Sequence, residues 1–267
     1  MNGVNKTLYI PLYGKSEVSK KNIILKDPTA EHIWEQEGFP LKGKSKSKWL
    51  AYYMGMRARV FDEWLHGMMQ KYPEAVVLHI GCGMDSRIHR VGGNALWYDI
   101  DFEEVINERK KYYEETDTYR MIASDARDTS YLANMPTKQG IVVLEGISMY
   151  LKPEELEKMT ADLAVHFDKI HILMDCYTTK AAKASQHKNP INDVGVTLVY
   201  GLDEPTRLSE AVRNTNDRLA SFQFVKEHNM TPDEIVKELK GMEKAIFKSV
   251  FAGKLSKSLY RMYEFEK

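Results

Sequence analysis

Residues 76 to 87 read Val76-Val-Leu-His-Ile-Gly-Cys-Gly-Met-Asp-Ser-Arg87, and this stretch indicates the fold. A run of apolar residues leads directly into Gly81-x-Gly83, and glycines at such a turn let the backbone adopt positive φ and approach a ligand closely. Open α/β sheets bind nucleotide-like ligands where a strand ends in this way. The stretch predicts a ligand-binding turn, although a Gly-x-Gly pair alone fits a tight turn without a ligand equally well.

The surrounding sequence alternates short apolar runs with longer amphipathic segments, as βαβ units require. The near-continuous apolar runs are typical of strands covered on both faces. We therefore expect an α/β fold with a Rossmann-like, mostly parallel sheet and an antiparallel last strand over Ser258–Phe265. The other predicted strands are Val76–Ile80, Ala95–Asp99, Tyr119–Ala123, Ile141–Leu144 and Ile170–Asp175, and the clearest helices are Asp101–Glu115 and Pro153–His166.

Two regions lie outside this alternation within what we expect to be one domain, residues 1–267. Residues 1–70 are predicted to form a helical cap, because Ser47–Gln70 carries apolar residues at the spacing of one helix face. Residues 176–230 are mixed, with a predicted strand at Val196–Tyr200, and we expect an insertion that forms a wall or lid over a site. The cofactor-binding core is expected at 71–175, and a helix and the last strand at 231–267.

The ends of the predicted strands indicate which ligand binds. A dinucleotide-binding turn has a third glycine three residues after Gly83, where this chain has Ser86, so a nicotinamide cofactor is disfavoured. A carboxylate about 20 residues after the glycines accepts hydrogen bonds from ribose hydroxyls. Asp101 follows Gly83 by 18 residues and is the preferred candidate. Asp99 shares its strand face and stays an alternative, and a helix cap is a further interpretation of Asp101.

Two later strands end in further polar groups. Asp125 follows the third strand, where an aspartate can accept a hydrogen bond from an adenine amino group while the backbone N–H of Ala126 donates to the ring. Glu145 follows the fourth strand, where a carboxylate can pair with the ammonium group of an amino-acid ligand. Each residue has a structural alternative, a polar loop for Asp125 and a buried structural carboxylate for Glu145. Their occurrence in order along the chain favours a single site.

Composition narrows the class of partner. The 38 basic and 38 acidic residues cancel, which is not typical of nucleic-acid-binding proteins. The alternating lysines at 42–48 are interpreted as a solvated loop. Cys82 and Cys176 lie outside any metal-ligand spacing, so neither a zinc site nor a disulfide is expected. No apolar run approaches membrane-spanning length, and we expect a cytoplasmic protein with no membrane partner.

Taken together, the motifs resemble the leucine carboxyl methyltransferase family, in particular its bacterial branch of polyketide-synthesis O-methyltransferases of the tetracenomycin type. The resemblance spans about residues 27 to 265. It is carried by His79-Ile-Gly-Cys-Gly-Met-Asp-Ser-Arg87, Tyr98-Asp-Ile-Asp-Phe102, Asp125-Ala-Arg-Asp128, Glu145-Gly-Ile-Ser-Met-Tyr-Leu151, Met56-Arg-Ala-Arg-Val-Phe-Asp62 and Gly201-Leu-Asp-Glu-Pro205.

The resemblance implies a class I methyltransferase fold, S-adenosyl-L-methionine as cofactor and methyl transfer to oxygen, often of a carboxylate. It further implies that Arg57 binds the cofactor carboxylate, that Gly81 contributes the glycine-loop contact and that Asp101 holds the ribose. Adenine contacts are implied for Asp125 and Ala126, and a position near the methionine moiety for Glu145. The short chain and its insertion resemble the bacterial branch, which implies a small-molecule acceptor rather than a protein terminus.

Helix geometry bears on Arg57 independently. It lies on the apolar face of the predicted helix, three to four residues from Tyr53 and Phe61, whereas Arg59 points elsewhere. A cation on an apolar face needs a partner, which is either a bound carboxylate or a carboxylate of the protein. No histidine lies in a recognisable base motif; His187 and His228 are possible bases but are interpreted as ordinary surface residues, so no catalytic residue is assigned.

Two other functional classes remain open. One is a nicotinamide-dependent oxidoreductase on a similar sheet, which cofactor titration would distinguish. The other is a catalytically silent module that retains only the cofactor pocket, which turnover of labelled cofactor would exclude. The sequence identifies neither the acceptor nor the oligomeric state.

Overall fold

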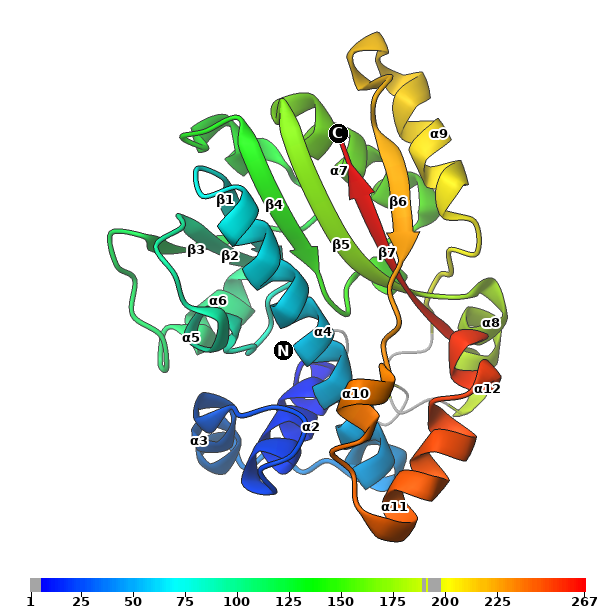
Figure 1. Cartoon of the computed structure of the whole chain (residues 1–267). Helices are drawn as coiled ribbons and strands as arrows, with labels where there is room; N and C mark the ends of the chain where they lie inside the picture. The colour runs from blue at the N-terminus through cyan, green and yellow to red at the C-terminus, as the bar shows by residue number, and fades with distance from the viewer. Residues whose placement is uncertain (1–5, 189–190, 192–197) are drawn as a thin grey trace.

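The computed structural model describes residues 6–188, 191 and 198–267, and their side chains apart from those of 186–188, 255 and 256. The described strands form one sheet in the order β3-β2-β1-β4-β5-β7-β6 (Figure 1). They are β1 (Val76–Ile80), β2 (Trp97–Asp101), β3 (Tyr119–Ala123), β4 (Gln139–Leu144), β5 (Lys169–Tyr177), β6 (Gln223–Glu227) and β7 (Tyr260–Glu266).

The sheet is parallel except at β7, which pairs antiparallel with both β5 and β6. The predicted mostly parallel sheet with an antiparallel last strand is therefore confirmed. Each parallel strand of the central part ends at the same edge, which faces the helices drawn in the lower half of Figure 1. That edge is where open α/β sheets place their ligands.

Helices cover both faces of the sheet and also the edge where the strands end. They include α2 (Tyr9–Lys20), α3 (Pro28–Glu37), α4 (Lys48–Lys71), α5 (Arg87–Val91), α6 (Glu103–Arg109), α7 (Pro153–His166), α8 (Thr179–Lys188), α9 (Pro205–Thr215), α10 (Asp233–Val236), α11 (Gly241–Ile246) and α12 (Lys254–Lys257). Short 3-10 turns are η1 (Gly43–Lys46), η2 (Ser130–Asn134), η3 (Ser148–Tyr150) and η5 (Asp217–Leu219), and the π-helical turn η6 (Phe247–Phe251) follows α11.

Alternating side chains of the buried strands supply two cores, one on each face of the sheet. Val76 and Leu78 of β1 pack with residues of α7 and α9, whereas Val77 packs on the face that α4 covers. The period-two alternation of a strand produces this division. The α4 helix crosses the sheet and continues beyond its edge, where it packs against α2. This long helix thereby connects the sheet to the N-terminal helices, and its middle lies over the strand ends.

The predicted boundaries of β2, β4, β5 and β7 differ from the observed ones by one or two residues, and the helix after β2 is shorter than predicted. The second strand occupies Trp97–Asp101 rather than Ala95–Asp99, because it pairs with β1 from Trp97 and with β3 as far as Asp101. The helix predicted over Asp101–Glu115 is shorter, Glu103–Arg109, and Asp101 belongs to the strand. Strand limits are set by the lengths of the partner strands, which a local pattern does not contain.

The segment 176–230 contributes to both the cavity and the sheet. Among its described residues, several between Tyr177 and Ile191 line the strand-end cavity, while β6 extends the sheet and α9 packs in the second core. Of the strand predicted over Val196–Tyr200, residues 196 and 197 lie outside the described residues, and 198–200 are not a strand. The extended backbone there makes a single bridge, between Tyr177 and Gly201. The division of the chain at 70, 175 and 230 otherwise stays a prediction.

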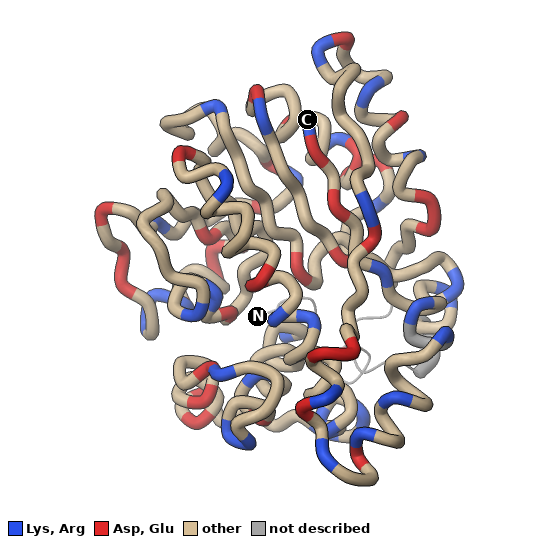
Figure 2. Tube along the Cα trace, viewed as in Figure 1, with Lys and Arg blue, Asp and Glu red and all other residues tan. Residues whose placement is uncertain are grey.

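Basic and acidic residues are interspersed along most of the described elements (Figure 2). No helix within the described ranges is long and apolar enough to span a membrane. Nor do the described residues bring three or more histidine, cysteine, aspartate or glutamate side chains together as metal ligands.

Candidate functional site

A cavity of about 850 Å³ lies at the carboxyl ends of the parallel strands. The loops that follow β1, β2, β3 and β4 form its floor, and residues of α2 and α4 lie on its opposite side. All seven residues predicted from the strand ends and from α4 line this one cavity, namely Arg57, Gly81, Gly83, Asp101, Asp125, Ala126 and Glu145. A volume in this range is typical of small-molecule and cofactor sites.

The glycine loop has the conformation that the sequence predicts. Gly81 and Gly83 have φ of +70° and +52°, in the left-handed region that side chains disfavour. A Cβ atom at Gly81 would lie 2.5 Å from Cδ1 of Ile147, and one at Gly83 would lie 3.3 Å from Cβ of Leu8. The loop therefore lies directly beneath the N-terminal segment, and its backbone is part of the cavity surface.

Asp101 and Asp99 have different environments, which separates the two candidates. The Asp101 carboxylate lines the cavity and accepts hydrogen bonds from the N–H groups of Gly83 and Phe102, each 2.8 Å long. Burial raises the pKa of Asp101 to about 6, although these two bonds favour the ionised form. Asp99 is 1% exposed and is bonded to Trp97, His79, Tyr119 and Arg109 beneath the floor. Asp99 thus has a structural position, and Asp101 is the carboxylate that a ligand can reach.

Asp125 and Ala126 form the cavity wall beyond Asp101. An Asp125 oxygen accepts hydrogen bonds of 2.9 Å from both the backbone N–H and Nε of Arg127. These bonds fix the carboxylate and lower its pKa, so it is ionised and oriented before any ligand arrives. Ala126 is buried and lines the cavity next to it.

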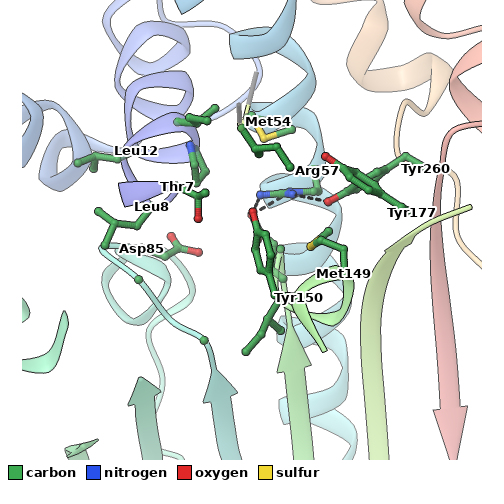
Figure 3. Close-up of a pocket in the computed structure, with 18 of the residues that line it drawn as sticks. Thr7, Leu8, Leu12, Met54, Arg57, Asp85, Met149, Tyr150, Tyr177 and Tyr260 are labelled. Carbon is green, nitrogen blue, oxygen red and sulfur yellow. Dashed lines mark hydrogen bonds and ion pairs between the residues drawn. The ribbon is translucent and has the colours of Figure 1, made fainter. Parts of the chain in front are cut away.

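Arg57 lies at the opposite end, where α4 passes over β4 and β5. It is 4% exposed, whereas the Arg59 side chain is about a third exposed, as the helix-face argument predicts. Its Nη2 atom lies 2.9 Å from Glu145, and its Nη1 donates to Asp175 (3.0 Å) and to the Tyr260 hydroxyl (2.9 Å). Figure 3 shows the guanidinium pointing toward Tyr260. Arg57 therefore has carboxylate partners within the protein itself.

Glu145 also has two cationic partners. Burial opposes ionisation of Glu145, but the charges of Arg87 and Arg57 outweigh this effect and lower its pKa to about 2. Asp175 behaves in the opposite way, because burial raises its pKa despite the nearby charge of Arg57. Glu145 is consequently a firmly ionised carboxylate at the floor of the cavity.

Lys15 of α2 is the principal site residue that sequence reasoning missed. It is 2% exposed and lines the cavity, and its ammonium group lies 2.9 Å from Asp85 in the glycine loop. A buried lysine on a helix otherwise rich in apolar residues is the signal that could have identified it. Figure 3 places Asp85 below the helix that carries Leu12, with Thr7 and Leu8 between them.

These contacts form one buried ion network in which acidic groups are in excess. Four basic side chains are joined by contacts of 4 Å or less to five carboxylates. Burial lowers the pKa of neighbouring His79, which favours its neutral form, so it is not counted among the cations. Charges buried together at this density must be nearly balanced. The network favours a ligand that brings positive charge. Its members are Lys15, Arg57, Arg87 and Arg90, with Asp27, Asp62, Asp85, Glu145 and Asp175.

The remaining part of the cavity is mainly apolar and aromatic, with Lys44 and Ser47 also among its lining residues. Trp49, Leu50 and Tyr53 come from the first turns of α4, and others come from η3, α8, η6 and the start of β7. The acidic residues that line the described cavity lie at or just after the ends of β1 to β4, and they are Asp85, Asp101, Asp125 and Glu145. The contribution of the C-terminal segment, Val250, Phe251, Leu259 and Tyr260, was not predicted.

Of the two histidines considered as bases, the structure describes the side chain of one. The side chain of His187 lies outside the part of the chain that the structure describes. His228 lies beyond the Tyr53 ring, where its Nε2 is 2.6 Å from a Glu264 oxygen. Among the described lining residues the one imidazole is that of His79, which bonds to Asp99 and Arg87 under the floor.

The sheet order, the single antiparallel strand and the pocket over the strand ends define a class I methyltransferase fold. Magnesium protoporphyrin IX methyltransferase of Synechocystis, solved with bound SAH, has a TM-score of 0.51 and 13% identity, covering 90% of this chain and 94% of that one. The plantazolicin methyltransferase BamL has a TM-score of 0.51 and 13% identity, covering 98% and 97%. At this identity the likeness shows the fold.

The chain belongs to the leucine carboxyl methyltransferase family, whose profile matches residues 14–164. It is 26% identical over 248 residues to the tetracenomycin polyketide synthesis O-methyltransferase TcmP of Streptomyces glaucescens, covering 91% of this chain and 89% of that protein. It is 25% identical over 247 residues to an S-adenosyl-L-methionine-dependent methyltransferase, dpfgK, of Gibberella zeae, covering 83% of each. The family resemblance recognised in the sequence is confirmed.

Proposed function

We propose that this protein transfers a methyl group from S-adenosyl-L-methionine to an oxygen atom of a small apolar aromatic molecule. The oxygen belongs to either a carboxylate or a hydroxyl group. The family membership and the cavity with its two unlike ends support this proposal. The single observation that carries it is the ordered set of polar groups on four successive strand ends, which all line one cavity. An acidic, hydrogen-bonding end suits the cofactor, and the aromatic end suits the acceptor.

Charge favours S-adenosylmethionine over a nicotinamide cofactor. S-adenosylmethionine carries an ammonium, a sulfonium and one carboxylate, so its net charge is positive, whereas NADH carries an anionic pyrophosphate. The buried network beside the glycine loop has five carboxylates and four basic side chains. A positive ligand balances this excess, while a pyrophosphate would add to it. Ser86 in place of a third glycine supports the same choice.

Each predicted residue has a proposed role that its position permits. Asp101 accepts hydrogen bonds from the ribose hydroxyls, and Asp125 with the Ala126 N–H binds the adenine edge. The Gly81–Gly83 backbone lies along the methionine part. Its ammonium group is assigned to Glu145, and its carboxylate to Arg57 and Lys15, two of the basic residues that line the cavity. Among the described residues, Arg57 is the one cation paired with Asp175. By contrast, Asp85, the partner of Lys15, also contacts Arg87 and Arg90. Because Lys15 is easier to release, we assign the larger share of carboxylate binding to it.

When bound, the cofactor supplies an electrophilic methyl group, which the acceptor oxygen must approach to about 3 Å in line with the sulfur. The protein's part is positioning and exclusion of water by the aromatic end. A carboxylate acceptor is ionised at neutral pH and needs no base, whereas a phenol gains from one. The absence of acidic groups among the described lining residues of that end agrees with an anionic acceptor. The buried thiols of Cys82 and Cys176 are free, and we propose a reducing cytoplasm as the compartment.

A screen of labelled methyl transfer from S-adenosylmethionine to small aromatic acids and phenols tests this function. Transfer to an oxygen of at least one acceptor supports it. Binding of the cofactor without transfer to any acceptor, in a screen that covers both classes, favours the catalytically silent module instead. Binding of NADH rather than the demethylated product would contradict the cofactor assignment.

A further inference from the structure

A second, smaller cavity of about 280 Å³ lies behind the aromatic end of the main one. Two residues, Tyr53 and Tyr260, line both cavities. Their rings lie in an edge-to-face arrangement, with centroids 6.1 Å apart and an interplanar angle of 73°. The pair is therefore the partition between the two spaces.

The two tyrosines of this partition have different surroundings. The Tyr260 hydroxyl donates to Asp175 (2.7 Å) and accepts from Arg57 (2.9 Å), so Tyr260 is part of the buried ion network. The Tyr53 hydroxyl instead donates to the sulfur of Met230 at 3.6 Å, and Met230 belongs to the second cavity. Tyr53 is thus the member of the partition that can be altered without breaking an ion pair of the network.

The second cavity differs in chemistry from the aromatic end. Lys257 and Arg261 line it, opposed by the single acidic lining residue Glu227. Arg261 donates from Nη1 to Glu227 (2.6 Å), while its Nε is buried and has no hydrogen-bond partner among the described residues. A buried donor without a partner on Arg261, with Lys257 as a second cation lining the same cavity, fits a ligand group that accepts hydrogen bonds and carries negative charge.

We propose that Tyr53 sets the length of the acceptor that this protein takes, and that the cavity behind it is a distal subsite for an anionic substituent. The inference rests on the proposed function, because it assigns the aromatic end to the acceptor. With the ring in place, an acceptor extends from the cofactor as far as Tyr53. Without the ring, the pocket continues into the space lined by Lys257 and Arg261, which then receives the far end of a longer acceptor.

The test uses the full chain saturated with S-adenosylhomocysteine and three acids of increasing reach: benzoate, biphenyl-4-carboxylate and biphenyl-4,4′-dicarboxylate. Calorimetry gives the Kd of each for the wild type, Tyr53→Ala and the matched control Tyr53→Phe. We expect Tyr53→Ala to shift the ratio of affinities toward the dicarboxylate by at least about tenfold, as a charge-assisted contact allows. Tyr53→Phe keeps the ring and should keep the wild-type ratio.

A double variant separates length from charge. Tyr53→Ala alone should raise the affinity for biphenyl-4-carboxylate relative to benzoate, because the pocket is longer. Tyr53→Ala with Arg261→Gln should keep this gain and lose the additional preference for the dicarboxylate. An unchanged ratio in Tyr53→Ala, or an equal shift in Tyr53→Phe, would overturn the proposal, as would failure of all three acids to bind. The thermal midpoint and the affinity for S-adenosylhomocysteine show whether each variant is folded. If Tyr53→Ala is not folded, Tyr53→Leu is used in its place. If the wild type does not bind S-adenosylhomocysteine, the proposed function itself is wrong. This outcome is thereby distinguished from a failure of the subsite proposal alone.

Discussion

Lowering the pH from 7.5 to 5 is expected to weaken binding of S-adenosylhomocysteine about tenfold, through the titration of Asp101. Burial raises the pKa of Asp101 to about 6 in the free protein. Ribose hydroxyls donate hydrogen bonds, so the ligand favours the ionised carboxylate. At pH 5, one unit below that pKa, roughly one molecule in ten carries the ionised form, and the apparent affinity falls by the same factor. Above pH 7 the affinity should be constant.

The assay is calorimetric titration of the full chain at about half-unit pH steps between roughly 5 and 8. Asp101→Asn is the matched control, because the amide has the same shape and does not titrate. Its affinity should be lower at neutral pH, by roughly 1–3 kcal/mol, and nearly independent of pH. A pH dependence that persists in Asp101→Asn, or no dependence in the wild type, would refute the assignment.

The same pKa has the opposite effect on the stability of the free protein. The pKa of Asp101 is higher in the folded than in the unfolded chain, so its contribution to stability is fully present below about pH 4 and is lost as the pH rises through about 6. Relative to Asp101→Asn, which does not titrate, the unliganded wild type should therefore lose stability as the pH rises from about 4 to 7. Thermal melts at several pH values measure it.

Three further substitutions test the site. Arg57→Ala leaves buried Asp175 without its cationic partner and Glu145 with Arg87 alone, and it should destabilise the fold by about 3–5 kcal/mol, whereas Arg59→Ala should cost under about 1 kcal/mol; equal losses of thermal midpoint would contradict the buried network. Gly81→Ala meets Ile147 at 2.5 Å and a positive φ, so cofactor affinity and stability should both fall, and an unaffected variant would show that the loop is not tightly packed. Asp99→Ala should mainly lower the thermal midpoint, while the protein that remains folded should bind the cofactor nearly as tightly as the wild type. A loss of cofactor affinity with an unchanged thermal midpoint would instead identify Asp99 as the ribose ligand.

The sequence predicts the floor of the site well, because local patterns determine it. Apolar runs predict the strands, the positive-φ glycines follow directly from Gly81-x-Gly83, and parallel strands bring Asp101, Asp125 and Glu145 to one edge. The helical period of α4 also placed Arg57 on the buried face. In each case the information lies within one element or in the general geometry of a parallel sheet.

The roof and the far end of the site could not be predicted in the same way. Tyr260 lies some 200 residues from Arg57 and meets it only because β7 inserts beside β5. Lys15 reaches Asp85 through the packing of α2 over the glycine loop. Likewise, β6 joins the sheet and α9 packs in its second core, although their segment has no strand-like apolar run. These contacts depend on tertiary packing, which neither spacing nor periodicity encodes.

Parallel calorimetric titrations of the full chain with S-adenosylhomocysteine and with NADH show whether the strand-end cavity binds S-adenosylmethionine. We expect saturable binding of S-adenosylhomocysteine at micromolar Kd, weakened in Asp101→Ala, and no comparable binding of NADH. Clear binding of NADH with none of S-adenosylhomocysteine would contradict the cofactor assignment.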